Sequence, residues 1–244
     1  MRVVLTLAFV SLVSAIGGCA PEGSSAYVSF NIPPDDSCMY SPSSELFIPS
    51  GAFDIGDDDT TEYCKRSYRL HLIVNSNLKS NERVSTGRAE PNVLQVTEAD
   101  VRLMDKNQGT LSFPKSRTDS TPDPSFPNPF RVQTANSLRP SSSTDPSMGV
   151  VAVEAIPKAY ASKLTGFDGD NILVEVQIYG TTTGDVDIDF RPFIYPVAIC
   201  RGCMSVCLNA LEDVKESELI GDQCDDDGAQ DGRFCIDPAP DCGK

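Results

Sequence analysis

The sequence predicts an all-β fold on three observations. Apolar and polar residues alternate with a period of two along several segments, most clearly in Ile172–Tyr179. No segment shows the 3.6-residue period of a long amphipathic helix. Pro and Gly, 18 and 17 of the 244 residues, separate the alternating segments. About seven or eight short strands without a long helix are typical of an immunoglobulin-like β-sandwich, and a β-barrel is the alternative.

We expect the sandwich to occupy residues 68–199. Its first strand, 68–78, has an apolar face of even-numbered residues, namely Tyr68, Leu70, Leu72 and Val74. In the second strand, 93–104, the parity of the apolar residues changes halfway. A β-bulge near Thr97 and Glu98 would restore the inward face, and the sequence therefore predicts one there.

The middle of this region is less regular. A short strand is expected at 109–113 and a longer one at 148–156. Pro157–Leu164 has the pattern of a two-turn helix with proline at its first position. Residues 114–147 are rich in Pro, Ser, Thr and Asp, which leaves few apolar side chains for a core. We predict one long surface loop there.

The clearest strand lies near the end of the sandwich and is followed by a return strand. Its inward residues are Ile172, Val174, Val176 and Ile178. After a turn at 180–184, residues 186–190 lead back with Val186, Ile188 and Phe190 inward, and 193–199 continue the pattern. The outward residues of the return strand are Asp185, Asp187 and Asp189. A solvated face is favoured over a cation site for this acidic row.

Two irregular regions flank the sandwich. Residues 19–67 carry strand-like pieces at 26–32 and 46–48 between Pro, Ser and Asp residues, which predicts a lead-in with edge strands. Residues 200–244 hold six of the nine cysteines and form a cysteine-rich irregular tail.

Residues 1–18 have the layout of a lipoprotein signal peptide. Arg2 precedes an uncharged apolar stretch, and Ile16-Gly17-Gly18-Cys19 resembles a bacterial lipobox. We predict cleavage after Gly18 and acylation of Cys19 with a diacylglycerol and an N-acyl chain such as palmitate, and we expect no other cofactor. At about 0.8 kcal/mol for each buried methylene, these chains would anchor the protein to the membrane permanently. A plain signal peptide or an uncleaved anchor is the alternative.

The predicted location is the bacterial cell envelope. Ala20 stands where an inner-membrane retention signal would place Asp, and by resemblance to enterobacterial sorting rules this points to the outer membrane, on either its periplasmic or its surface face. The chain is acidic, with 35 Asp and Glu residues against 20 Lys and Arg residues and a net charge of −15. Such a chain repels polyanions, which argues against a nucleic-acid partner.

The cysteines that remain after Cys19 are an even number, as expected for disulfides in an exported chain. They are Cys38, Cys64, Cys200, Cys203, Cys207, Cys224, Cys235 and Cys242. We expect the tail to be bridged mostly within itself, which leaves Cys38–Cys64 by elimination. Thiolates spaced as Cys200-x-x-Cys203 could also bind zinc or act in redox chemistry. The oxidising compartment and the helix-poor body favour disulfides.

Several motifs occur together in this chain: the lipobox, Tyr-x-Leu-x-Leu-x-Val-Asn at 68–75, Gly-Arg-Ala-Glu-x-Asn at 87–92, and Pro-Val-x-x-Cys-x-Gly-Cys at 196–203. Gln230-Asp231-Gly232 then precedes Cys235 in the tail. In this combination the chain resembles a group of uncharacterised envelope lipoproteins from myxobacteria and related bacteria. The resemblance implies a secreted, anchored β domain and no particular chemistry.

No catalytic residues are predicted. His71 is the single histidine; it lies mid-strand opposite the apolar face, and no Gly-x-Ser-x-Gly motif supplies a nucleophile. Asp225-Asp226-Asp227-Gly228 resembles a fragment of a calcium loop, but an EF-hand alignment places Gln223 and Phe234 where acids are required. Looser calcium coordination at 57–59 or 225–227 is the less favoured interpretation beside solvated acidic turns.

These observations lead to one functional expectation and one alternative. We expect a non-enzymatic envelope lipoprotein that is anchored to the membrane and serves a structural or interaction role with an envelope protein partner. The alternative is a module that binds a small ligand, a glycan or calcium at the cell surface. Binding residues would lie in loops, since a rigid sandwich presents its loops to partners.

Overall fold

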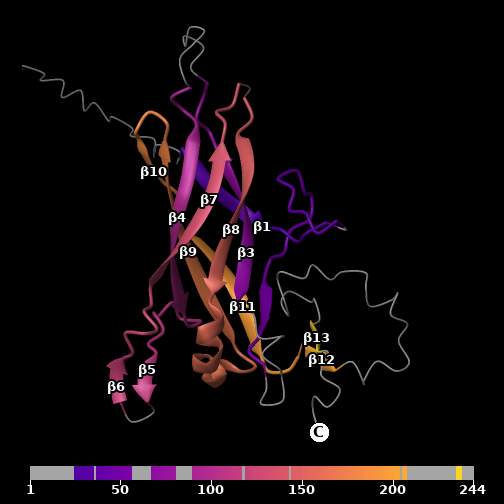
Figure 1. Cartoon of the computed structure of the whole chain (residues 1–244), viewed down its shortest axis with the longest axis vertical. Helices are drawn as coiled ribbons and strands as arrows, with labels where there is room; N and C mark the ends of the chain where they lie inside the picture. Colours follow the sequence, from indigo (N-terminus) through magenta and orange to yellow (C-terminus); the bar gives the residue numbers. More distant parts are fainter. Residues whose placement is uncertain are drawn as a thin grey trace, which may run out of the picture.

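The computed structural model describes residues 25–35, 37–56, 67–80, 90–116, 119–142, 144–203, 205–207 and 235–237. The fold is all-β, as the sequence predicts, and is drawn in Figure 1. The strands are β1 (Ala26–Asn31), β2 (Gly51–Asp54), β3 (Tyr68–Ser76), β4 (Leu94–Met104), β5 (Pro114–Ser116), β6 (Asp119–Pro122), β7 (Phe130–Leu138), β8 (Ser147–Ile156), β9 (Asn171–Thr182), β10 (Asp187–Asp189), β11 (Phe193–Cys200), β12 (Ser205–Cys207) and β13 (Cys235–Asp237).

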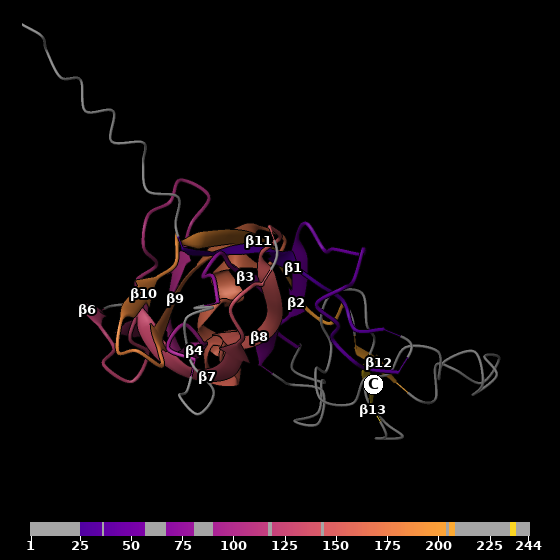
Figure 2. The ribbon, with the colours of Figure 1, turned by 90° about the horizontal axis from the view of Figure 1, so that it is seen from above.

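Two sheets enclose the core. The smaller has the strand order β1-β3-β8, and the larger has the order β2-β11-β9-β4-β7 with β10 paired to β9. Relative to an immunoglobulin sandwich, β1, β3 and β8 take the places of strands A, B and E, and β11, β9, β4 and β7 take those of G, F, C and C′. The strand order therefore agrees with the predicted immunoglobulin-like architecture. Seen from above, the sheets curve around a shared interior (Figure 2).

Period-two alternation builds the core. The four predicted inward residues of β9 are fully buried, as are the four even-numbered apolar residues of β3. Burying one such side chain contributes about 1.5–3 kcal/mol. In β4 the pairing with both neighbours shifts between Val96 and Glu98, which confirms the predicted β-bulge. On the return strand Ile188 and Phe190 are buried, but Val186 is 57% exposed, so its predicted inward orientation was wrong.

Strand β3 is buried on both faces. Besides the even-numbered residues, His71, Ile73 and Asn75 are buried, whereas Arg69 is exposed. The ring of Tyr40, which lies in the connection between β1 and β2, stacks on the His71 ring with centroids 3.4 Å apart. The alternation correctly predicted the core face of β3. The connection between β1 and β2 covers much of the opposite face.

The long loop predicted at 114–147 requires correction. This segment contains the small β5–β6 ladder and the nine-residue strand β7, which pairs with β4 at an edge of the larger sheet. Thr134 Oγ1 donates a 2.8 Å hydrogen bond to Ala152 O of β8, and Asn136 Nδ2 donates one to Val150 O. Side chains of β7 therefore bond to the backbone of β8 and connect the two sheets on this side.

The turn before β7 is fixed by side chains. Asn128 Nδ2 donates to the carbonyl oxygens of Leu103 and Leu111, both at 2.8 Å, and its Oδ1 accepts from Leu103 N at 2.9 Å. The Tyr160 ring packs against three phenylalanines with centroids 5.2–5.3 Å away, namely Phe113, Phe126 and Phe130. These contacts attach the proline-rich segment to the core.

Three further boundaries differ from the predictions. The expected helix at 157–164 is a 3-10 helix, Lys158–Lys163, and Pro157 is its N-cap residue rather than its first residue. The expected strand at 109–113 reduces to a bridge between Thr110 and Met104. The second strand of the lead-in is Gly51–Asp54 and not 46–48, although Ile48 does bridge Asn31. Both lead-in strands are edge strands, as expected.

Candidate functional site

The end of the sandwich near Cys200 brings together residues that are far apart in the sequence. Strands β2 and β11 run parallel, and their register places Asp54 beside Cys200. Beyond this pair, Ile55 N donates a 2.9 Å hydrogen bond to Cys200 O. The parallel pairing thus fixes both backbones where the Cys200-x-x-Cys203 motif begins.

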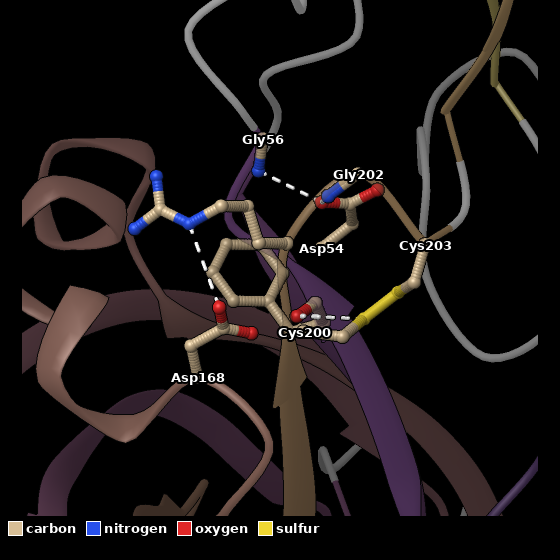
Figure 3. The surroundings of a disulfide bond; sticks show 8 residues. Asp54, Gly56, Asp168, Cys200, Gly202 and Cys203 are labelled. Carbon is tan, nitrogen blue, oxygen red and sulfur yellow. Dashed lines mark hydrogen bonds and ion pairs between the residues drawn. A yellow bond between two sulfur atoms is a disulfide. The ribbon is translucent and has the colours of Figure 1, made fainter.

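Asp54 holds the turn that carries this motif. Its Oδ1 accepts hydrogen bonds from Gly56 N and Gly202 N, each at 2.8 Å, and the residue is only 4% exposed. Gly202 has a φ of 61°, in the left-handed region that glycine adopts readily. This conformation directs the N–H of Gly202 toward the carboxylate, as Figure 3 shows.

Cys200 and Cys203 form a disulfide, as the sequence analysis favoured. Cys203 is exposed and Cys200 is half-buried, with its Sγ 3.7 Å from the carbonyl oxygen of Phe53. One carboxylate oxygen of Asp54 and the two sulfur atoms lie within 4.8 Å of one another. At the rim, the Arg201 guanidinium lies 3.5 Å from the Asp168 carboxylate, and both side chains are more than a third exposed.

The chemistry of this arrangement depends on whether the two cysteines are joined in a disulfide. A zinc ligand is a thiolate, and the sulfurs of a disulfide carry no such charge, so the oxidised pair does not fit a cation. In the reduced state the same atoms would offer two sulfur ligands and one oxygen ligand. Among the described residues, this is the one group of three or more potential metal ligands in such proximity. The acidic row on the return strand forms no such group within the described part of the chain. Its three side chains, Asp185, Asp187 and Asp189, are exposed.

A second polar cluster lies on the outer face of the larger sheet. Arg131 of β7 binds both carboxylate oxygens of Asp100 at 2.6 and 2.9 Å, and Glu98 at 2.7 Å. Its guanidinium also lies over the Tyr179 ring, whose hydroxyl donates to Asp100 at 3.2 Å. The hydrogen bond from Arg131 lowers the pKa of Asp100, and burial, together with the nearby Asp100 charge, raises the pKa of Tyr179. The cluster joins three neighbouring strands.

A third feature is the segment between β1 and β2, which we call the 37–49 segment. It presents three large apolar side chains to solvent: Met39, Leu46 and Phe47 are 64, 68 and 60% exposed. Its start is ordered by Asp35, whose Oδ1 accepts 2.9 Å hydrogen bonds from Ser37 N and Met39 N. The Phe47 ring lies 5.9 Å from that of Phe30 in β1.

The other predicted site residues divide between described and undescribed parts of the chain. Cys38 is disulfide-bonded, but Cys64, its predicted partner, lies outside the described residues. Cys207 and Cys235 lie in β12 and β13, which pair in parallel. The structure describes the backbone of these two strands but not their side chains. The lipidation residue Cys19, the tail residues Cys224 and Cys242, and the acidic runs at 57–59 and 225–227 also lie outside it. His71 has the structural position that the sequence favoured.

Sequence reasoning did not find Asp54. Gly202 and Asp54 are 148 residues apart, and only the parallel pairing of β2 with β11 brings them together. A single acid at the end of a four-residue strand carries no local signal of this role.

Comparison with known proteins places this chain in no group. No family model, no curated protein and no solved structure matches it significantly. Within the part of the chain that the structure describes, no helix has the length and hydrophobicity needed to cross a membrane.

Proposed function

We propose that this protein is a lipid-anchored envelope protein that binds a protein partner through the 37–49 segment. The anchor is the acylated Cys19 that the lipobox predicts, at the outer membrane, and the resemblance to myxobacterial envelope lipoproteins supports the same location. In this proposal the sandwich is a non-enzymatic interaction domain.

The observation that carries the proposal is the exposure of Met39, Leu46 and Phe47. Single exposed apolar residues are common, but three large ones within nine residues of one surface segment are typical of an interaction surface. Aromatic residues and methionine are enriched in the buried centres of interfaces.

The segment is well ordered before binding. The Asp35 turn, the disulfide at Cys38 and the stacking of Tyr40 on His71 restrain its first half, and the bridge from Ile48 to Asn31 restrains its end. A restrained segment loses less conformational entropy when it binds, which favours affinity.

Charge indicates the chemistry of the partner. Residues 32–50 contain no Lys or Arg, whereas Asp35 and Glu45 are acidic and exposed. The complementary surface is therefore an apolar patch bordered by basic side chains.

Site-specific photo-crosslinking tests this surface in cells that express the full-length chain. A photoreactive amino acid at position 47 should give one crosslinked species of defined mass, and the additional substitution Leu46→Ser should reduce its yield about tenfold. The matched control places the same amino acid at position 186, since Val186 is similarly exposed at 57% on another part of the fold. Equal crosslinking from both positions would contradict the proposal.

The anchor is tested separately. The intact mass of the mature protein should correspond to an acylated Cys19 with residues 1–18 removed, and the Cys19→Ser variant should be lost from the membrane fraction. Normal membrane retention and processing of that variant would contradict the anchor without affecting the crosslinking result.

A further inference from the structure

We propose that Cys200 and Cys203 are an exchangeable pair, opened and closed by thiol–disulfide exchange with a dithiol, and that Asp54 is the positioning residue that keeps the reduced thiols in place. The inference concerns the opposite end of strand β2 from the 37–49 segment, and it does not depend on the function proposed above.

The cross-link contributes little to holding the fold together. Cys200 and Cys203 are three residues apart, and a cross-link that closes a shorter loop removes less conformational entropy from the unfolded chain, so it stabilises the fold less. Both ends of this short loop are also held without it. The β2–β11 ladder fixes Cys200, and the hydrogen bond from Gly202 N to Asp54 fixes the turn. Reduction should therefore leave the sandwich folded.

The two cysteines differ in exposure. Cys203 is exposed, whereas Cys200 is half-buried and packs beside Phe53. An incoming thiolate therefore reaches the sulfur of Cys203 first. The Phe53 carbonyl oxygen, 3.7 Å from the Cys200 sulfur, can accept a hydrogen bond from the thiol that forms when Cys200 leaves.

The dithiol opens the Cys200–Cys203 disulfide in two steps. A thiolate of the dithiol attacks Cys203 Sγ and forms a mixed disulfide, and the electron pair of the broken S–S bond leaves on Cys200, which takes up a proton. The second thiol of the dithiol loses its proton and attacks the dithiol's own sulfur in the mixed disulfide, and Cys203 leaves with the electron pair of that bond and takes up a proton. The dithiol is oxidised to a disulfide, and the protein pair is reduced to two thiols. Closure is the reverse reaction with an oxidised dithiol.

Asp54 keeps the two thiols of the reduced state in place. Its hydrogen bonds to Gly56 and Gly202 keep the turn, and hence the two thiols, close together, which makes reclosure fast. The Asp54→Asn variant retains an oxygen that can accept the same hydrogen bonds but lacks the charge.

The first test is graded reduction of the full-length protein with dithiothreitol or with reduced thioredoxin, followed by alkylation and peptide mapping. The Cys200–Cys203 disulfide should open at least tenfold faster than the disulfide at Cys38, with the far-ultraviolet circular dichroism of the sandwich unchanged. Opening by either dithiol supports the proposal. Comparing the two reagents shows whether a small-molecule dithiol or a protein dithiol reduces the pair. Opening that occurs later than at Cys38, or only with loss of the β signal, would overturn it.

Single-cysteine variants test the direction of attack. With oxidised glutathione, Cys203 in the Cys200→Ser variant should form a mixed disulfide about tenfold faster than Cys200 in the Cys203→Ser variant. For Asp54, the rate at which the reduced pair recloses with oxidised dithiothreitol should fall about tenfold in Asp54→Ala and stay close to the wild-type rate in Asp54→Asn, which keeps an acceptor oxygen for Gly56 and Gly202. Equal rates in the first comparison would refute Cys203 as the attacked residue, and an unchanged reclosure rate in Asp54→Ala would refute the positioning role of Asp54.

Discussion

Asp54 and Asp100 are two carboxylates that each accept several hydrogen bonds, yet their surroundings differ. Asp54 is 4% exposed and accepts from two backbone N–H groups, whereas the Asp100 side chain is 32% exposed and accepts from Arg131 and Tyr179. In water, broken hydrogen bonds are replaced by bonds to solvent; in a buried site they are not. Burial, more than the number of hydrogen bonds, should therefore decide how much each residue contributes to stability.

Replacing Asp54 should have the largest effect. Asp54→Ala leaves the buried N–H group of Gly56 and the partly buried N–H group of Gly202 without this acceptor, at a cost of about 2–4 kcal/mol in the free energy of unfolding. Asp54→Asn, which keeps an acceptor oxygen, should lose less than half of that. Chemical denaturation of the full-length protein with its disulfides intact measures both. A loss below about 1 kcal/mol for Asp54→Ala would mean that water reaches these groups.

Asn128 provides an intermediate case because its site is only partly buried. Asn128→Ala removes three hydrogen bonds to the backbone of Leu103 and Leu111, and we expect a loss of about 1–3 kcal/mol. The matched control is Asn107→Ala in the exposed turn at 105–109, which should change the free energy of unfolding by less than about 0.5 kcal/mol. Equal effects at positions 128 and 107 would break the proposed dependence on burial.

Burial also explains which parts of the fold could be predicted from the sequence. Strand β9 follows from its own alternation, because every second residue enters the core. The bulge of β4 follows from the change of parity near Thr97 and Glu98. In both cases the information lies within one strand, where burial of apolar side chains dominates.

The parts that were missed depend on pairings between distant segments. Strand β7 was missed because its inward face, which includes Phe130, Val132 and Leu138, is interrupted by Thr134 and Asn136. These two polar side chains bond to carbonyl oxygens of β8 instead of packing in the core. The Asp54 cluster depends on a parallel pairing across most of the chain. Polar side chains that bond to a backbone leave no periodic pattern, so neither feature could be found from hydrophobicity.

Replacing Arg131 should lower the free energy of unfolding less than replacing the buried Asp54 or the partly buried Asn128. Its side chain is 52% exposed, and exposed ion pairs typically contribute no more than about 1 kcal/mol. Arg131→Ala should therefore lower the free energy of unfolding less than Asn128→Ala does at low salt, and less still in 1 M salt, where screening is strong. A salt-independent loss as large as that of Asn128→Ala would indicate that the cluster supports the sheet by packing against Tyr179 and not by charge.

The smallest expected effect is the pH dependence of this exposed cluster. The hydrogen bond from Arg131 lowers the pKa of Asp100 in the folded protein below the ordinary value of an aspartate. A carboxyl group with a lowered folded pKa stabilises the protein above its unfolded pKa, and this contribution is lost as the pH falls through the folded pKa. The difference in stability between the wild type and Asp100→Asn should therefore shrink as the pH is lowered below about 4. Titration followed by NMR should find the pKa of the Asp100 carboxyl below the ordinary aspartate range in the wild type and higher in Arg131→Ala. An identical titration in both proteins would show that Arg131 is not the cause.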